Sequence, residues 1–401
     1  MSATATEVVI VGGGPVGACA AALLARAGVA VTLLEPHPPE PIPAGAAPET
    51  RVVALSRASE RTLRAAGAWG GIEGVRLAPY ERMRIWHESR DVSAALVFDA
   101  ADVGEPNLGY ILENRLLQRA LLDAFSAAGG RLERTAFTGL RMSAEGALLS
   151  TASGELNARL VIGADGADSR VRAAAGLSAA TGDYHQNAIV ANVATERPHE
   201  HTAWQRFMHD GTLAFLPLAD GSSSIVWSAD TARAAGLLAL DTEAFAAALD
   251  EGSGHALGRT RLLSARVAVP LRRLNAAHYV AERVALVGDA AHVVHPLAGQ
   301  GVNLGLLDAA ALAQVVIAGR AAREDPGALG VLRAYERWRK SEVAVMAGAI
   351  EVFDRLLAHG TGPLARLAQA GLAAVNRSQE LRGFFIRRAL GMSGELPQVA
   401  R

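Results

Sequence analysis

A glycine-spaced turn near the N-terminus constrains the fold more than any other feature of the sequence. Residues 8–35 read "VVIVGGGPVGACAAALLARAGVAVTLLE". The β-branched run at residues 8–11 predicts a strand, residues 16–26 predict a helix that Gly28 ends, and residues 29–34 predict a second buried strand. Strand, helix and strand in this order predict a Rossmann-like βαβ unit.

The glycines of this turn each answer a physical demand. Gly12 permits the sharp turn, Gly14 lets the backbone approach a pyrophosphate, and Gly17 lets the helix pack closely on the strand. Pro15 completes the turn and Val16 opens the helix, whose free N–H groups and positive dipole suit phosphates.

The acid at the tip of the second predicted strand completes the pattern. Glu35 is placed to accept hydrogen bonds from an adenosine ribose. The pattern does not distinguish NAD from FAD, because both carry the ADP half that it binds. The rest of the chain must decide between them.

Length and composition narrow the function classes. With 401 residues, half of them hydrophobic, the chain forms two domains or one large composite domain. A net charge of -1 gives no general attraction to nucleic acid. The single cysteine, Cys19, excludes a disulfide framework and the paired thiols of a disulfide-reducing flavoenzyme, and it fits a reducing cytosolic setting.

No targeting or membrane-spanning segment is predicted. The N-terminus lacks the basic residues that open a secretory signal. Residues 8–25 are uncharged and long enough to span a bilayer. The glycines and the proline of residues 12–17 would break a helix there, which argues against a span.

A second turn follows the segment "ARLVIGADGADSR". Residues 160–162 predict a strand, and Ser169 predicts the start of a helix. Asp165 and Gly166 lie between them. Taken alone, this stretch is a polar turn between a strand and a helix.

A third turn lies in "VALVGDAAHVVHPLAGQGVNLGLLD", residues 284–308. Residues 284–287 predict a strand, and Asp289 at its end is positioned to receive hydroxyl groups such as those of a ribityl chain. Gly299, Gly301, Val302 and Asn303 place small residues and unpaired N–H groups at the start of a helix. Such a site suits a ring edge that becomes anionic on reduction.

The two histidines of this stretch raise the question of a metal. His292 and His295 are spaced as a pair on one helix turn, but no third ligand is near and Pro296 interrupts the helix that the pair would need. No metal site is predicted. His292 is expected either to contact a ligand or to be a packed core residue.

Together these motifs resemble a known family. The GxGxxG turn, "GADGADSR" and "GDAAHVVHPLAGQGVNLGLLD" resemble the FAD-dependent aromatic hydroxylases, the class A flavoprotein monooxygenases. Within them, "HPLAGQGVNLGLLD" is similar to the ubiquinone-biosynthesis hydroxylases. Further similar stretches are "RVVALSRASERTLRAAGAW", "ILENRLLQRAL", "GTLAFLPL" and "NRSQELRGFFIRRALGMSG".

The resemblance implies roles for the residues singled out above. Asp289 would hold the ribityl-pyrophosphate part of FAD, and Asp165 with Gly166 would serve FAD and NAD(P)H contacts together. Arg51 and Gln118 match positions that reach the phosphate or ribose side of the flavin. The remaining assignments are the ADP moiety for Gly12, Gly14, Gly17 and Glu35, and the isoalloxazine ring for Pro296, Gly299, Gly301, Val302 and Asn303, with His295 and Pro296 bordering that ring. No catalytic side-chain base is assigned.

The predicted fold class is α/β, with a Rossmann-like FAD-binding domain, an inserted mixed or antiparallel β-sheet domain for the substrate, and a helical C-terminus. Residues 1–75, 105–175 and 276–330 form the FAD-binding domain, and residues 331–401 form the helical region. Residues 76–104 and 176–275 form the substrate domain, because they contain short alternating runs such as "RMRIWHES", "QNAIVANVAT" and "SSSIVWSA".

Two sets of residues each have two possible interpretations. Met83, Ile85, Trp86, Phe207 and Trp227 either form ordinary sheet core or line an apolar pocket. The family match of "FLPL" leads us to assign Phe215, Pro217 and Leu218 to that pocket, and Trp227 is assigned to it with them. Residues 377–388, with Phe384, Phe385 and Ile386, either meet a membrane or partner or form a packed helix with a solvated basic face.

The resemblance also implies an activity. NAD(P)H and O2 would be used with FAD to hydroxylate the ring of a polyprenylated phenol in ubiquinone biosynthesis. Such an enzyme is expected in the cytoplasm, in peripheral contact with the inner face of the membrane and with biosynthetic-complex partners. The alternatives are a flavin hydroxylase acting on another aromatic, such as a hydroxybenzoate or an antibiotic precursor, and a non-catalytic flavin-bound scaffold.

Overall fold

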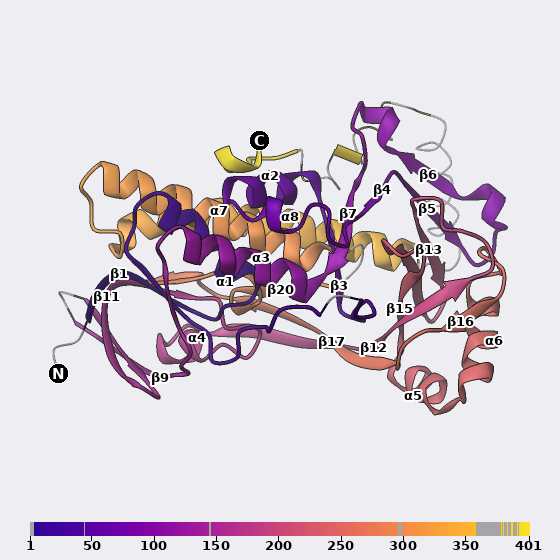
Figure 1. The fold of residues 1–401 in the computed structure, drawn as a ribbon, viewed down its shortest axis with the longest axis horizontal. Helices are drawn as coiled ribbons and strands as arrows, with labels where there is room; N and C mark the ends of the chain where they lie inside the picture. The colour runs from indigo at the N-terminus through magenta and orange to yellow at the C-terminus, as the bar shows by residue number, and fades with distance from the viewer. Residues whose placement is uncertain are drawn as a thin grey trace.

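The computed structural model describes residues 4–43, 45–143, 146–295, 299–357, 378, 380, 383, 386, 387, 391 and 393–401. The molecule is elongated (Figure 1). A layer of helices that includes α1, α3 and α7 lies over a sheet containing β1 and β11 at one end, and a second sheet with α5 and α6 occupies the other end. The fold is the predicted α/β class.

The first sheet has eight strands, and its central strands are parallel. Strands β1 and β2 are parallel neighbours and are joined by α1 (Pro15–Arg26), which confirms the βαβ unit. The residues of β2 are all buried, as expected for a parallel strand covered on both faces. The strand order is β18 (Val280–Ala281), β19 (Val284–Leu286), β11 (Gly154–Gly163), β1 (Thr4–Val11), β2 (Val31–Leu34) and β8 (Arg131–Glu133), with β10 (Ala147–Thr151) and β9 (Phe137–Met142) branching from β11.

The register of this sheet aligns three strand ends. Val11 of β1 is paired with Gly163 of β11, and Gly163 is paired with Leu286 of β19. Because all three strands run in the same direction, the turns that follow them lie at one edge of the sheet. The three motifs interpreted separately in the sequence are therefore neighbours in space.

The second sheet has nine strands and is mixed, since β5 and β13 are parallel and the other pairs are antiparallel. Its order is β20 (His292–Val293), β17 (Val267–Ala276), β12 (Ala179–Thr195), β15 (Ser223–Asp230), β14 (Gly211–Pro217), β13 (Thr202–Met208), β5 (Arg82–His87) and β6 (Leu96–Asp99), with β16 (Thr260–Leu262) beside β12. The strand-like runs of the sequence are confirmed here.

Two helices, α5 (Thr231–Ala239) and α6 (Thr242–Gly252), interrupt this β-rich region and were not expected. Asp241 caps α6 by accepting a hydrogen bond from the N–H of Ala244 at 2.8 Å. Both helices pack on one face of the second sheet, where Phe245 and Leu237 join its buried residues. The domain bounds drawn from the sequence stay a prediction.

A small third sheet and the remaining helices complete the described chain. The sheet comprises β3 (Val52–Leu55), β7 (Gly109–Glu113) and β4 (Ala78–Tyr80). The helices are α2 (Arg57–Ala65), α3 (Asn114–Ala127), α4 (Arg170–Ala174), α7 (Gln300–Ala321) and α8 (Leu329–Leu357). Short 3-10 turns are η1 (Trp69–Gly71), η2 (Val92–Ala94), η3 (Ala100–Val103), η4 (Gly288–Ala290) and η6 (Gln398–Ala400).

Two apolar stretches of the described chain bear on membrane spanning. The uncharged run at residues 8–25 is divided between β1 and α1, so it is not one spanning helix. Helix α7 is long and apolar enough to cross a bilayer, judged by length and composition alone. Because 67% of its apolar window is buried inside the structure, the same features fit a core helix of a folded domain.

Candidate functional site

The glycine-spaced turn is held by backbone contacts that leave no room for side chains at two of its positions. Gly12 has a φ of +104°, and a Cβ atom there would lie 2.4 Å from the carbonyl oxygen of Ala164 in the second motif. A Cβ atom on Gly17 would lie 2.0 Å from the carbonyl oxygen of Gly12. Gly12 and Gly17 are therefore required by the packing of the protein itself.

Gly14 is different, because the protein around it does not require a glycine. Its φ of -60° is open to any residue, and a Cβ atom would meet nothing within 4 Å. The open space lies at the N-terminus of α1, where no side chain caps the helix. A pyrophosphate of FAD needs this combination of a smooth backbone and free N–H groups, so the residues present fit the cofactor.

Glu35 and Gln118 fix the middle of this turn. A carboxylate oxygen of Glu35 accepts a hydrogen bond from the N–H of Gly13 at 2.9 Å, and the other accepts one from the N–H of His37 at 2.9 Å. The side-chain amide of Gln118 donates to the carbonyl oxygen of Gly13 at 2.9 Å. Each Glu35 oxygen keeps a lone pair for a ribose hydroxyl. The contacts of both residues with FAD stay a prediction.

Asp165 of the second motif is engaged within its own turn. Its carboxylate accepts hydrogen bonds from the Ser169 hydroxyl at 2.5 Å and from the N–H groups of Arg170 and Val171 at 2.7 and 3.1 Å. It therefore caps α4. Gly166, with a φ of +82°, turns the chain between Asp165 and the start of α4. The assignment of Asp165 and Gly166 to cofactor contacts stays a prediction.

Arg172, which the sequence analysis missed, ties the second motif to the third. Its guanidinium donates to the carbonyl oxygens of Ala167 and Ala290 at 2.8 and 2.9 Å. Ala290 directly follows Asp289, so this bridge fixes two of the three turns relative to each other. The sequence shows only a basic residue shortly after "GADGADSR", which does not identify its partners.

Asp289 is exposed to solvent just after the end of β19. Surrounding protein raises the pKa of its carboxyl above the ordinary value, while the charges of His292 and Arg51 act in the opposite direction. The exposed Arg51 side chain thus comes from the segment before β3 to the same edge as Asp289. A hydroxyl-rich ligand could reach both side chains.

Asn303 anchors the start of α7 to the small third sheet and α2. Its side-chain oxygen accepts hydrogen bonds from the Ser56 N–H at 2.9 Å and the Ser59 hydroxyl at 2.7 Å. Its side-chain nitrogen donates to the carbonyl oxygens of Ala54 and Gly299 at 2.8 and 3.1 Å. Asn303 is therefore occupied by protein contacts, and only its backbone remains to face a flavin.

The other residues assigned to the ring contribute shape. Gly299 has a φ of +63° at the N-cap of α7, and a Cβ atom there would lie 3.1 Å from Cβ of Ala54. A Cβ atom on Gly301 would enter open space, and Val302 is half-buried. Pro296 lies outside the described residues. The contacts of this segment with a flavin ring stay a prediction.

Helices α1 and α7 begin at the same edge of the first sheet. A Cβ atom on Gly305 would lie 2.5 Å from a methyl group of Val16, and one on Gly288 would lie 3.2 Å from Val16. Val16 is therefore the contact between α1, α7 and the turn that carries Asp289. Neither helix has a side-chain cap, so both present free N–H groups at this edge.

A buried ionic network supports the Asp289 turn from behind. Asp308 accepts hydrogen bonds from the Gly288 N–H at 3.1 Å, from His292 at 2.6 Å and from Arg339 at 2.7 Å. Burial alone would raise the pKa of Asp308, but His292 and Arg339 together hold it below its ordinary value. His292 is thus a core residue, and the described residues contain no cluster of three metal-binding side chains.

His295 follows β20 of the second sheet. Its imidazole is buried, hydrogen-bonds to the side-chain oxygen of Gln186 at 3.2 Å, and meets the Tyr184 ring edge-on at 4.7 Å. Both contacts come from β12 of the second sheet. The expected approach of His295 to a flavin ring stays a prediction.

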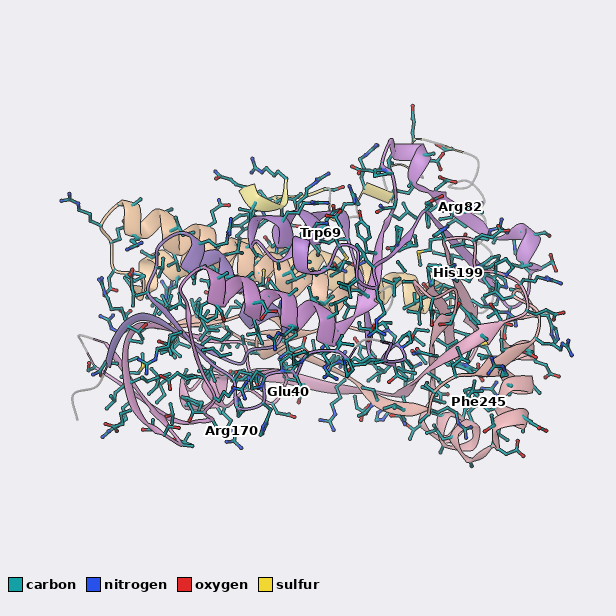
Figure 2. All side chains as sticks on the ribbon, viewed as in Figure 1. Glu40, Trp69, Arg82, Arg170, His199 and Phe245 are labelled. Carbon is teal, nitrogen blue, oxygen red and sulfur yellow. The ribbon has the colours of Figure 1, made fainter. Side chains whose placement is uncertain are left out.

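The four residues assigned to a substrate pocket are divided between two faces of the second sheet. Phe215 and Trp227 are buried beneath α5 and α6, and Trp227 meets the ring of Phe245 at 6.0 Å. Figure 2 shows Phe245 far from Trp69, which packs in the core of the first sheet. Pro217 lies two residues after Phe215 along β14, so both are on the same face of the sheet. Leu218 belongs instead to an apolar cluster with Ile111 and Ala54, close to the start of α7.

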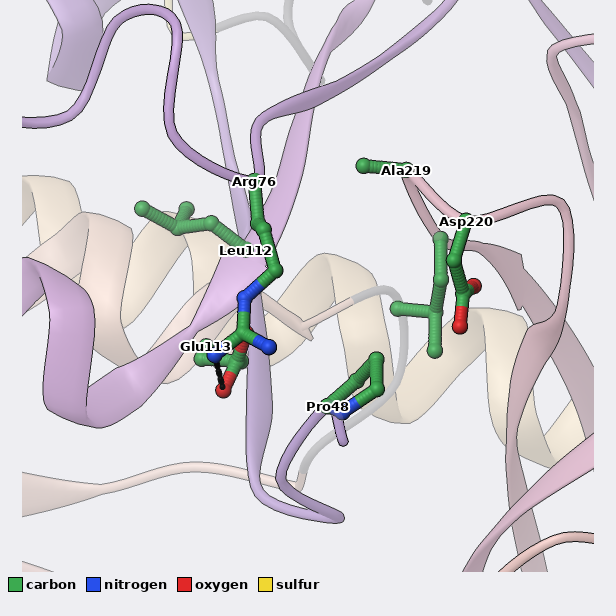
Figure 3. A pocket seen from close by; sticks show the side chains of 7 residues that line it. Pro48, Arg76, Leu112, Glu113, Ala219 and Asp220 are labelled. Carbon is green, nitrogen blue, oxygen red and sulfur yellow. Dashed lines mark hydrogen bonds and ion pairs between the residues drawn. The ribbon is translucent and has the colours of Figure 1, made fainter. Parts of the chain in front are cut away.

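A small pocket opens beside Leu218 (Figure 3). Arg76 and Glu113 form an ion pair at 2.8 Å on one side of it, and Pro48 lies below them. Leu112, Ala219 and Asp220 complete the lining. The pocket therefore lies where the third sheet meets the loop after β14.

Comparison with known proteins identifies the family. Residues 5–345 match the FAD binding domain family. The chain is 37% identical over 390 residues to the 3-demethoxyubiquinol 3-hydroxylase of Escherichia coli, covering 96% of this chain and 99% of that protein. It is 36% identical to the ubiquinone hydroxylase UbiL of Rhodospirillum rubrum, covering 98% and 92%, and 31% identical to human ubiquinone biosynthesis monooxygenase COQ6, covering 94% and 91%.

Solved structures agree on the fold. The p-nitrophenol 4-monooxygenase PnpA of Pseudomonas putida matches with a TM-score of 0.77 at 19% identity, over 97% of this chain and 99% of that one. PqsL, a probable FAD-dependent monooxygenase of Pseudomonas aeruginosa, matches with a TM-score of 0.73 at 22% identity, over 96% and 100%. The chain therefore belongs to the FAD binding domain family and, within it, to the FAD-dependent hydroxylases of ubiquinone biosynthesis.

Proposed function

We propose that this hydroxylase uses NAD(P)H and O2 to hydroxylate the aromatic ring of a polyprenylated phenol in ubiquinone biosynthesis. Three segments converge at one edge of the first sheet, and this observation carries the proposal. They are the turn with the open space beside Gly14, the Asp289 turn and the start of α7. The names of the relatives, which refer to ubiquinone and demethoxyubiquinol, support the substrate class.

The chain's own residues would hold FAD by its two ends. Gly12, Gly14 and the N-terminus of α1 would receive the pyrophosphate, with Glu35 at the adenosine ribose. Asp289, beside Arg51, would accept hydrogen bonds from the ribityl hydroxyls. When bound, FAD supplies the redox and oxygen chemistry that side chains cannot perform.

The start of α7 would act on the ring end. The uncapped N–H groups after Gly299 provide positive potential for negative charge on the cofactor. Asn303 holds this helix start by hydrogen bonds to Ala54 of the third sheet and to Ser56 and Ser59 at the start of α2. The protein's contribution is thus orientation, electrostatics and exclusion of water.

The surroundings of the reaction belong to the same proposal. One dinucleotide-binding turn is visible in the described chain, which fits transient docking of NAD(P)H on a surface already occupied by FAD. The polyprenylated substrate is membrane-resident, so we place the enzyme in the cytoplasm, in peripheral contact with the inner membrane face and with biosynthetic partners. The described part of the C-terminal tail includes Ile386, which is buried against Ala100 and Leu108, while most of residues 377–388 lies outside the described residues.

Lipid analysis of cells lacking this protein tests the proposal. We expect such cells to accumulate a prenylated precursor that lacks one ring hydroxyl, which mass spectrometry would identify. In vitro, the purified enzyme with FAD should consume NAD(P)H faster when a short-tailed prenylated phenol is added and should form the hydroxylated product. Normal quinone profiles in the deleted strain and no product in vitro would refute the proposal.

A further inference from the structure

Three large apolar side chains are exposed close together on the second sheet. Leu263, which follows β16, is 43% exposed, and Val267 and Val269 of β17 are 46% and 47% exposed. They are three of the seven most exposed large apolar side chains in the described chain. Ala268 and Pro270 are exposed as well, so four consecutive apolar residues of β17 face solvent. Such a run marks a surface that has a partner.

The exposed run, residues 267–270, lies at an edge of the second sheet. On one side it pairs with β12. On the other side, β20 pairs only with Leu274 and Asn275 among the described residues. The exposed run is therefore open along one edge as well as on both faces, which is unusual for an apolar strand.

The sequence around the exposed run is basic. Between Glu251 and Glu282 the chain contains five arginines and no acidic residue. Arg261 precedes the run, Arg272 and Arg273 follow it, and all three side chains are exposed. None of these three guanidinium groups forms an ion pair with an acid of the described chain. Their charges are available to an anionic partner.

The other charged groups nearby do not cancel this positive charge. Arg259 lies 3.6 Å from Glu196, and Arg266 donates to two backbone carbonyl oxygens at the end of α5. Asp183 of β12 is the cross-strand neighbour of Arg272, and its carboxylate already accepts a backbone N–H two residues further along. The surface stays positive with this acid included, because three arginines outnumber it.

Two features favour a lipid surface over a strand of another protein. Pro270 has no N–H group to donate, so it interrupts the backbone pairing that an added strand would need. The exposed run is apolar on both faces, and a strand that enters a headgroup layer by its edge is surrounded on both faces. Exposed apolar residues flanked by basic ones are typical of proteins that bind anionic bilayers from one side.

Strand β17 also connects this surface with the candidate site. It continues from Val269 to Asn275, which pairs with His292 of β20 just after the Asp289 turn. At about 3.3 Å per residue, this part of the strand is about 20 Å long. An extended lipid tail can cover that distance.

We propose that the exposed run and Leu263 insert into the headgroup layer of an anionic bilayer, where the flanking arginines, Arg261, Arg272 and Arg273, contact the lipid phosphates. This orientation deepens the peripheral membrane contact of the proposed function. It rests on that function for the substrate, whose prenyl tail stays in the bilayer while its ring enters the site.

Sedimentation with vesicles tests the assignment. FAD-loaded wild type, Val269→Glu and the double variant Arg272→Gln/Arg273→Gln are mixed with vesicles of phosphatidylcholine and phosphatidylglycerol, or of phosphatidylcholine alone. We expect wild type to bind the anionic vesicles, and to bind them less well as salt is added. Each variant should lower the partition coefficient onto anionic vesicles at least about tenfold.

Matched variants on other surfaces control for charge and folding. Val399→Glu replaces another exposed valine, on η6, which lies on the opposite side from β17 in the view of Figure 1. Arg333→Gln/Arg337→Gln removes two exposed charges from α8. We expect both controls to bind vesicles within about twofold of wild type. Because all replaced side chains are exposed, every variant should keep its bound FAD and its melting temperature.

Three results would overturn the assignment. The first is that wild type does not bind anionic vesicles. The second is that wild type and both β17 variants bind them equally. The third is a dimer, detected by light scattering, that Val269→Glu dissociates in the absence of any vesicle binding, because the surface would then join two copies of the chain.

Turnover distinguishes this inference from the proposed function. Val269→Glu should hydroxylate a short-tailed prenylated phenol in vesicle-free solution as wild type does, and should be slower with a long-tailed phenol held in anionic vesicles. If wild type hydroxylates the soluble phenol but does not bind vesicles, the membrane surface is wrong and the proposed function stands. If wild type binds vesicles through β17 but hydroxylates neither phenol, the proposed function fails and the surface stands.

Discussion

At the scale of single residues, the three glycines of the first turn have different origins. Gly12 and Gly17 are imposed by backbone atoms of the protein, whereas the space beside Gly14 is open. A residue that the protein itself does not need to be glycine is informative, because the demand then comes from a ligand. This distinction yields a clean test of cofactor binding.

Replacing Gly14 with valine should impair FAD binding while sparing the fold. The Cβ and methyl groups would fill the space next to the N-terminus of α1, where we place the pyrophosphate. We expect the purified variant to lose its yellow colour and the Kd for FAD to rise at least about tenfold. The melting temperature of the FAD-free protein should stay close to that of FAD-free wild type.

Gly17→Ala is the contrasting variant. Its Cβ atom would lie 2.0 Å from the carbonyl oxygen of Gly12, so the FAD-free protein itself should lose about 1–3 kcal/mol or more of stability. A Gly14→Val protein that retains FAD with wild-type affinity would contradict the placement of the pyrophosphate.

Asp289 gives a prediction about pH. The pKa of the Asp289 carboxyl is raised from 3.8, so the folded protein favours the protonated carboxyl. The stability that the folded protein gains from this raised pKa is fully present below pH 3.8. It is lost as the pH rises through the raised value and the carboxyl ionises. Asp289→Asn removes this loss. Without FAD, the variant should melt above wild type at pH 7, and the difference should vanish near pH 3.5. Equal differences at both pH values would contradict this account.

At the scale of elements, the Asp308 network joins four pieces of the chain. Asp308 belongs to α7, Arg339 to α8, His292 to β20 and Gly288 to η4. Asp308 and Arg339 are 0% and 1% exposed, so neither charge can be solvated if its partner is lost. The network therefore controls where the Asp289 turn sits on α7.

Arg339→Met should destabilise the protein strongly. It leaves the Asp308 carboxylate buried with His292 as its remaining side-chain partner, and breaking a buried pair in this way costs about 3–5 kcal/mol. Chemical denaturation measures the loss. The control is Arg337→Met on the same helix, where the side chain is exposed, and we expect a change within about 0.5 kcal/mol there. Similar stabilities for the two variants would argue against the network.

At the scale of the whole molecule, the two large sheets are linked at the site. The chain leaves β19 of the first sheet at Leu286, passes through Asp289, and enters β20 of the second sheet at His292. A ligand bound to the Asp289 turn therefore contacts the connection between both sheets. Figure 1 shows β12 and β17 running from the helix-covered sheet toward α5 and α6.

We expect FAD to stabilise both halves together. Trp69 packs in the core of the first sheet and Trp227 in the core of the second. The fluorescence of a variant whose only tryptophan is Trp69 therefore reports the unfolding of the first sheet, and that of a variant whose only tryptophan is Trp227 reports the unfolding of the second. Both should unfold at one midpoint, and FAD should raise both by the same amount. Two separate transitions, with FAD moving only that of Trp69, would show that the sheets are not coupled through the site.

Much of this arrangement could be predicted from local sequence. The βαβ unit and most strands of the second sheet were predictable because β-branched runs, alternation and glycine stops are local patterns. The third sheet and helices α5 and α6 were not, since β3, β4, α5 and α6 are short and their periodicity is weak. Phe215 and Trp227 illustrate a further limit: an apolar strand residue does not reveal which face of its sheet it occupies.

By itself, the sequence determined the βαβ unit and which family the chain resembles, because a strand, a glycine turn and a helix are consequences of local backbone geometry. Only the tertiary structure decided which side chains meet. It joined Arg172 to the Asp289 turn and occupied Asn303 with protein contacts. Such contacts depend on register between strands that are distant in the chain, and no local pattern encodes that register.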